Sequence, residues 1–272
     1  MNKEMLRQWA DELGLDLIGV APISRYENVA PQWNPLSILP TAKSVIAFAR
    51  EIPRGQFLGI EEGTFWISIA RQTHPWYAYD LCRRFEDQGI LAVPCSPLAP
   101  QRWPDGVVFG DAKVAPNVTP SLEYAATCAG LGEVGYNGLF LTPEFGVRQQ
   151  LGMLFTEYEL PADEPFAGGL CDREECAVCV RECPLGAMGA SKTVDYGAGE
   201  IRVADIDYKK CRYCKNGAFP DTSYHLAPPN RIAAACARAC IACLERRGLT
   251  RSASRYKKPF RTREPWGVGL YE

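Results

Sequence analysis

The sequence lacks the features of membrane-spanning, exported and nucleic-acid-coating proteins. Its longest apolar runs, such as residues 45–49, are far shorter than the roughly 18 to 20 residues that cross a bilayer. The opening MNKEMLRQWADELG contains acids and has neither an apolar signal core nor a twin-arginine pair. A net charge of −2 creates no overall field that attracts nucleic acid. We therefore expect a cytoplasmic protein with no membrane association and without nucleic acid as a partner.

Cysteine, by contrast, is abundant, with 12 residues in a chain of 272. Because thiols stay reduced in the cytosol, this density favours metal or cluster ligation over disulfides. Cys82, Cys95 and Cys128 stand alone, and we expect them to be buried in a core. The other nine cysteines lie within residues 171–243. The cysteine content therefore raises the question of which cofactor this segment holds.

The chain divides near residue 165, where prolines and acids mark a linker. Before it, the spacing of apolar residues predicts helices alternating with strands. The helices are expected over residues 5–13, 76–88 and from Pro120 to a glycine-rich turn, and the strands over residues 15–21, 44–49, 90–93, 138–141 and 151–158. We predict an α/β (α+β) domain over residues 1–165, a small loop-rich domain over 166–250 and a basic, solvated tail over 251–272.

The first cysteine motif has the spacing C-x4-C-x2-C-x3-C, followed by Pro184. It is formed by Cys171, Cys176, Cys179 and Cys183. The motif resembles the bacterial ferredoxin run C-x2-C-x2-C-x3-C-P, in which three thiolates bind one iron-sulfur cluster and the fourth reaches a second cluster. A structural zinc site is the alternative, but zinc needs only four ligands, usually in two separated pairs. The spacing therefore favours 4Fe-4S clusters.

Five further cysteines follow, at Cys211, Cys214, Cys236, Cys240 and Cys243. Two clusters need eight thiolates and nine are available. Ferredoxin-like cross-ligation would give one cluster Cys171, Cys176, Cys179 and Cys243, and the other Cys183, Cys211, Cys236 and Cys240. Cys214 is then either spare or a replacement for Cys211, and the spacing does not decide between them.

The stretches AGLGEVGYNG (residues 129–138) and LTPEFG (residues 141–146) resemble the core of cobalamin-dependent reductive dehalogenases. They are similar, less closely, to epoxyqueuosine reductase, as are LRQWADELGLDLIGVAP, PTAKSVIAFAR and residues 207–211. The resemblance implies a nitroreductase-like domain that binds a base-off corrinoid, followed by a ferredoxin-like domain with two 4Fe-4S clusters. It implies that the corrinoid lies against the glycine-rich turn, at Gly130, Gly132, Gly135 and Asn137.

Two positions depart from the resembled families. Epoxyqueuosine reductases have an acidic proton donor where this chain has Asn117, and an amide does not donate a proton usefully at neutral pH. Tyr136 stands at the lysine or arginine position of the turn, and a phenol can donate a proton when a nearby charge lowers its pKa. Tyr136 is therefore the catalytic candidate, with a packed core tyrosine as the alternative. Neither His74 nor His225 has the context D-x-H-x-x-G, so a histidine-bound corrinoid is not expected.

Together these features predict an oxidoreductase. It would pass single electrons from two clusters to a corrinoid, for reductive cleavage of a small organic substrate or for reduction of the corrinoid. The expected electron donor is of the ferredoxin or flavodoxin type. One alternative is a two-cluster electron-transfer protein without a corrinoid. Another is tRNA modification like that of epoxyqueuosine reductase, which Asn117 and the missing helical-repeat extension disfavour.

Overall fold

A four-stranded antiparallel sheet lies at the centre of the first half of the chain. The computed structural model describes residues 1–63, 76–95, 118, 120–219 and 229–264. The strand order is β1 (Leu17–Pro22), β2 (Ser44–Glu51), β6 (Gln149–Thr156) and β3 (Ala92–Cys95). The run Val45, Ile46, Ala47, Phe48 and Ala49 is buried along β2, as its apolar character predicts. The expected mixed α/β class is confirmed, in its antiparallel form.

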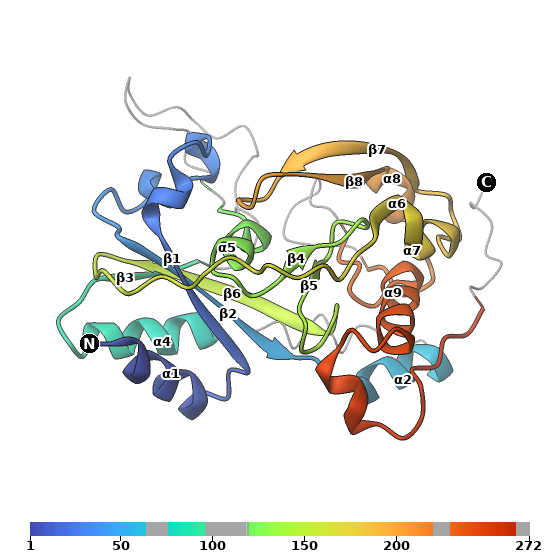
Figure 1. The fold of residues 1–272 in the computed structure, drawn as a ribbon, viewed down its shortest axis with the longest axis horizontal. Coiled ribbons are helices and arrows are strands. Elements are labelled where there is room, and N and C mark those ends of the chain that lie inside the picture. The colour runs from blue at the N-terminus through green and yellow to red at the C-terminus, as the bar shows by residue number, and fades with distance from the viewer. Residues whose placement is uncertain (64–75, 96–117, 119, 220–228, 265–272) are drawn as a thin grey trace.

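Helices cover both faces of this sheet (Figure 1). On one face lie α1 (Lys3–Glu12) and α4 (Trp76–Glu86), whose Trp9 and Phe85 rings meet edge to face at 5.5 Å between centroids. On the other face lies α5 (Leu122–Cys128), whose alanines pack against β1, β2 and β6. Three short 3-10 helices, η1 (Ile23–Tyr26), η2 (Pro31–Trp33) and η3 (Pro35–Ser37), follow β1. The sequence therefore predicted α1, α4 and α5, with shifted ends, and missed α2 (Arg54–Gly63).

The glycine-rich turn follows α5 directly and forms a small hairpin of β4 (Glu133–Val134) and β5 (Phe140–Leu141). The expected strand over residues 138–141 is therefore only two residues long. This hairpin lies between the central sheet and the cysteine-containing segment (Figure 1).

The cysteine-containing segment is more regular than the expected loop-rich domain. It contains α6 (Arg173–Cys176), α7 (Val178–Arg181), the hairpin β7 (Met188–Asp195) and β8 (Glu200–Ile206), α8 (Tyr208–Cys211) and α9 (Ala235–Arg246). The alanine-rich run RIAAACARACIAC forms most of α9, because alanine is the strongest helix former.

The two halves of the chain share one apolar cluster. Ile241 and other residues of α9 pack with Ile52, Phe57, Leu141 and Val147 from the first half. Ile52 directly follows β2, and Phe57 lies in α2 (Arg54–Gly63). The boundary near residue 165 remains a prediction, and the shared core shows that the segments on either side are packed together.

Most described residues of the basic tail over 251–259 are exposed, and the segment is also anchored on the protein. Arg251, in η4 (Arg251–Arg255), pairs with Glu144 at 2.9 Å, and Arg255 pairs with Glu51 at 3.1 Å. The Phe260 ring is buried and meets Phe57 at 5.7 Å between centroids. These contacts bind residues 251–260 to the end of β2, to α2 and to the segment after β5. No helix in the described ranges is long and apolar enough to cross a membrane.

Candidate functional site

The nine clustered cysteines fall into two groups. In the first thiol group, the Sγ atoms of Cys176 and Cys243 lie 3.7 Å apart, and the thiol of Cys240 is influenced most by those of Cys171 and Cys179. The first thiol group therefore comprises Cys171, Cys176, Cys179, Cys240 and Cys243. The last two lie on α9, which packs against α7, the helix that contains Cys179.

The second thiol group comprises Cys183, Cys211, Cys214 and Cys236. The thiol of Cys211 interacts with those of Cys236, Cys183 and Cys214, and Cys236 interacts with Cys183 and Cys214. Both Cys211 and Cys236 are buried. The groups adjoin, because the thiol that raises the pKa of Cys179 most, after burial, is Cys236 of the second group.

This grouping differs from the expected cross-ligation at two positions. Cys240 joins the first thiol group, and Cys214 joins the second. Each C-x3-C pair in the sequence now has one cysteine in each group. Cys179 is in the first group and Cys183 in the second, whereas Cys236 is in the second and Cys240 in the first. On α9 the spacing of four places Cys236 and Cys240 on one face, about one helical turn apart. Adjacent thiols on one helix face can therefore serve two neighbouring sites.

Burial keeps the thiols of Cys179, Cys211 and Cys236 protonated when no metal is bound. Desolvation, with neighbouring thiols adding to it, raises the pKa of Cys179 to about 12. Desolvation likewise raises the pKa of Cys211 to about 12 and that of Cys236 to about 11. Metal ligation requires the thiolate, so a bound cluster would have to displace these protons.

The three isolated cysteines have a different environment. Cys82 and Cys128 are buried in the core, as expected, whereas Cys95 is partly buried. Desolvation raises the pKa of all three to about 12. Their surroundings are consistent with packing roles.

Among the interactions described, buried arginines accompany only the second thiol group. Arg238 is 1% exposed and acts on Cys214, and Arg231 acts on two other thiols. Arg231 is 6% exposed and lowers the pKa of both Cys211 and Cys236, opposing the larger effect of burial. Its Nη1 donates to the carbonyl oxygen of Asn137 at 2.8 Å, which ties the arginine to the glycine-rich turn. The sequence analysis did not identify Arg231, because no spacing rule links it to the cysteines.

The glycine-rich turn holds the first thiol group in place. Glu133 Oε1 accepts hydrogen bonds from the backbone N–H groups of Leu170 and Cys171, both at 2.7 Å. The backbone N–H of Tyr136 donates to Cys171 Sγ at 3.3 Å. Backbone N–H donors to ligand sulfur are a known determinant of cluster potential. Glu133 was missed in the sequence, where the only signal was a carboxylate inside a turn of glycines.

The predicted cofactor-binding glycines are packed against the protein's own backbone. Gly130 has a φ of +74°, and a Cβ there would lie 2.1 Å from the carbonyl oxygen of Glu164. A Cβ at Gly132 would lie 1.9 Å from the carbonyl oxygen of Leu141. A Cβ at Gly135 would lie 3.0 Å from the Leu141 side chain. Close chain packing thus accounts for these glycines, and their contact with a cofactor remains a prediction.

Asn137 differs from these glycines because its side-chain amide has a hydrogen-bond donor without a partner among the described residues. Its side chain is 1% exposed, and Oδ1 accepts from the Leu139 N–H at 3.1 Å. Its buried Nδ2 has no hydrogen-bond partner among the described residues. A buried donor of this kind is costly unless a bound acceptor satisfies it, which suits the predicted binding role.

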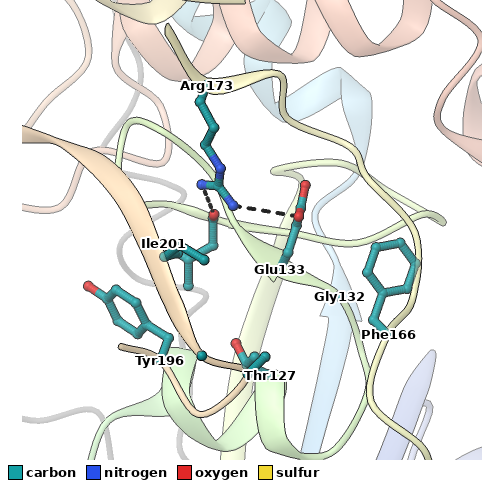
Figure 2. Close-up of a pocket in the computed structure, with 10 residues that line it drawn as sticks. Thr127, Gly132, Glu133, Phe166, Arg173, Tyr196 and Ile201 are labelled. Carbon is teal, nitrogen blue, oxygen red and sulfur yellow. Dashed lines mark hydrogen bonds and ion pairs between the residues drawn. The ribbon is translucent and has the colours of Figure 1, made fainter. Parts of the chain in front are cut away.

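A small cavity of about 160 Å³ opens beside the turn. Figure 2 shows Glu133 and Arg173 facing each other there, with Arg173 Nη2 and Glu133 Oε2 3.6 Å apart. Thr127, Phe166 and Tyr196 also line it. Pockets for drug-sized ligands measure roughly 300–1,000 Å³, and a corrinoid is larger still. This cavity therefore does not fit a corrinoid.

Tyr136, the predicted catalytic residue that the structure describes, is not among the residues that line this cavity. Tyr136 is 6% exposed and packs with Cys179 and Cys236 in an apolar cluster between the thiol groups. This position favours the packing alternative for the tyrosine. Asn117 lies outside the described residues.

The described part of the chain contains no three His, Cys, Asp or Glu side chains that converge on a single metal ion. Thiols that each bind a different iron of a cube need not converge on one point. The donors present, all of them buried or half-buried thiols in two groups, fit the chemistry of 4Fe-4S clusters.

Comparison with known proteins adds relatives of two kinds. No protein-family model matches the chain. An epoxyqueuosine reductase from Bacillus cereus is 26% identical over 249 residues, covering 78% of this chain and 56% of the relative. A tetrachloroethene reductive dehalogenase from Desulfitobacterium hafniense is 40% identical over 70 residues, covering 25% of this chain and 12% of the relative. The homologues of this chain are epoxyqueuosine reductases and reductive dehalogenases. The predicted resemblance is thereby confirmed.

Solved structures agree on the fold. A catabolic reductive dehalogenase has a TM-score of 0.59 at 20% identity, covering 93% of this chain and 33% of the dehalogenase. The fold of the described residues is thus that of the reductive dehalogenases. The chain spans only part of its relatives, 56% of the Bacillus epoxyqueuosine reductase and 12% of the Desulfitobacterium dehalogenase.

Proposed function

We propose that this chain is an oxidoreductase that holds two 4Fe-4S clusters. Its relatives are named reductases, and two adjoining groups of buried and half-buried thiols carry the proposal. A bound 4Fe-4S cluster supplies one-electron transfer at a potential set by its surroundings. The protein would therefore act in one-electron reduction.

The grouping supports a specific ligand set. Cys171, Cys176, Cys179 and Cys240 would hold one cluster, and Cys183, Cys211, Cys214 and Cys236 the other. Cys243 is then the ninth, spare thiol, close to the ligand Cys176. This set keeps the ferredoxin-like cross-ligation, in which each cysteine motif supplies one ligand to the other cluster. These ligands are Cys183 and Cys240.

The chain's own residues would prepare these sites. Glu133 fixes the backbone at Cys171 through two hydrogen bonds, and the Tyr136 N–H is directed at the same sulfur. The backbone N–H of Ala187 donates to Cys183 Sγ at 3.3 Å. Apolar residues and alanines surround both groups and exclude water. Each group thus has at least one sulfur oriented before a cluster arrives.

A corrinoid remains the further prediction, supported by the homologous reductive dehalogenases. The 160 Å³ cavity does not fit it, so no chemical step is assigned to it. The buried Nδ2 of Asn137 is the described group that suits a bound acceptor. An electron-transfer role without a corrinoid, and an RNA substrate such as that in a solved epoxyqueuosine reductase structure with a tRNA stem loop, are the alternatives.

Anaerobic reconstitution tests the proposal. We expect about eight iron and eight sulfide per chain, with a broad visible absorbance that reductant bleaches. Two zinc ions in place of iron, or no bound metal, would overturn the cluster proposal. Cobalamin is then added to the loaded protein and free cofactor is removed; a retained corrinoid spectrum supports the corrinoid, and complete loss of that spectrum rejects it.

A further inference from the structure

A short basic segment contains two thiols of the second thiol group, Cys211 and Cys214. Residues 208–215 read YKKCRYCK and contain four cations and no acid. The donor patch, as we define it, consists of Tyr208, Lys209, Lys210, Arg212, Tyr213 and Lys215. On a chain of net charge −2 this is a local concentration of positive charge.

The donor patch and the thiols belong to the same few residues. Cys211 lies between Lys210 and Arg212 in the sequence, and Cys214 directly precedes Lys215. The Cys211 side chain is 6% exposed. The carboxylate nearest in sequence, Asp207, caps α8 by accepting from the N–H groups of Lys209 and Lys210 at 3.0 and 3.2 Å. Within residues 208–215 themselves, the segment that contains two of the thiols, there is no acid.

Two exposed tyrosines complete the donor patch. Tyr213 is 63% exposed and Tyr208 is 38% exposed. Tyrosine is enriched in protein interfaces because its ring buries apolar area while its hydroxyl stays hydrated. The guanidinium of Arg231 lies 5.6 Å from the centre of the Tyr208 ring, so the patch is continuous with the buried charge beside Cys211 and Cys236.

The surface over the first thiol group has a different charge pattern. Its loop contains Asp172 and Glu174, which pair with Arg247 and Arg202. Glu175 adds a further exposed acid. An anionic partner would meet paired acids and arginines there, and a run of cations at the donor patch. The charge distribution therefore distinguishes the two groups as sites for a charged protein partner.

We propose that the donor patch docks an acidic one-electron carrier protein, and this inference depends on the proposed clusters. The reduced carrier would lose one electron, and the cluster held by the second thiol group would gain that electron. Opposite charges accelerate such encounters and make them sensitive to salt.

The test compares two matched charge reversals in the reconstituted protein. One variant carries Lys209→Glu and Lys210→Glu. The control carries Lys257→Glu and Lys258→Glu, an adjacent exposed pair in the tail with the same change of charge. The probe is reduced acidic flavodoxin, and the readouts are the rate of cluster bleaching at several salt concentrations and the dissociation constant of the complex. Bleaching by dithionite, a small reductant, is measured in parallel.

We expect the donor-patch variant to slow bleaching by flavodoxin about tenfold at low salt and to weaken its salt dependence. The control and all dithionite rates should match the unaltered protein. Equal flavodoxin rates in both variants would overturn the proposal. So would loss of affinity for a tRNA stem loop with unchanged flavodoxin rates, since the patch would then be a nucleic-acid surface. Absence of any cluster that dithionite bleaches would reject the proposed function itself, and this inference with it.

Discussion

The two thiol groups are built differently. The first contains five thiols, and one of them, Cys171, is held by Glu133 from the glycine-rich turn. The second contains four thiols, with buried arginines and a basic segment beside them. Glu133 joins the first group to the α/β half of the chain, and Arg231 joins the second group to the same turn; the second group alone contains the basic segment 208–215.

The largest difference should appear when Cys214 and Cys243 are replaced in turn. Cys214→Ala should lose about four iron per chain, because the second thiol group has no substitute ligand. Cys243→Ala should lose none, because the first group retains four thiols. Iron and sulfide analysis with electron paramagnetic resonance measures both. The reverse result, with loss only in Cys243→Ala, would restore the ligand set predicted from spacing alone.

Thiol alkylation at pH 8 should sharpen the same comparison. In the loaded protein, Cys243 should react while Cys82 and Cys128 do not, since burial raises the pKa of those two to about 12. A thiol with that pKa reacts roughly a thousandfold more slowly than an ordinary one, because only the thiolate is nucleophilic. Their labelling should rise as the pH approaches 12. Mass spectrometry of the labelled peptides measures this, and preferential labelling of Cys214 would contradict it.

Removing the positive charge of Arg231 should change the reduction potential of the second cluster only. Arg231→Gln should lower its reduction potential by roughly 60 mV, about 1.4 kcal/mol, because a nearby cation stabilises the added electron. Arg231→Lys retains the charge and serves as the control. Potentiometric titration followed by electron paramagnetic resonance separates the two clusters. Equal shifts in both potentials would indicate a structural effect instead.

The smallest expected effect concerns the backbone of the first group. Ala177, between Cys176 and Cys179, has a φ of +38°, in the left-handed region that disfavours side chains. Ala177→Gly should stabilise the cluster-free protein by about 1 kcal/mol, whereas Ala177→Val should destabilise it. Urea unfolding measures both. A destabilised glycine variant would show that Ala177 is not strained.

Much of the fold was predictable because its signals are local. The apolar run in β2 and the spacing of Leu6, Trp9 and Ala10 in α1 depend on neighbouring residues alone. The hairpin β7–β8 was missed, since exposed side chains dominate its strands and leave little alternation to detect.

The site was predictable to a lesser extent. Spacing identified the clustered cysteines, but the assignment of Cys214 and Cys240 to a group depends on how α9 packs against α7. That packing involves residues about 60 positions apart, for example Cys179 and Cys240. The roles of Glu133 and Arg231 likewise arise only when distant segments meet.

The hydrogen bonds of Glu133 have a consequence for biogenesis. Its carboxylate lies in the first half of the chain and holds the N–H groups of Leu170 and Cys171 in the second. The position of the first thiol is therefore defined only after the sheet and its hairpin have formed. Cluster insertion into this group should follow folding of the amino-terminal half, so the order of synthesis along the chain is also the order in which the cofactor site matures.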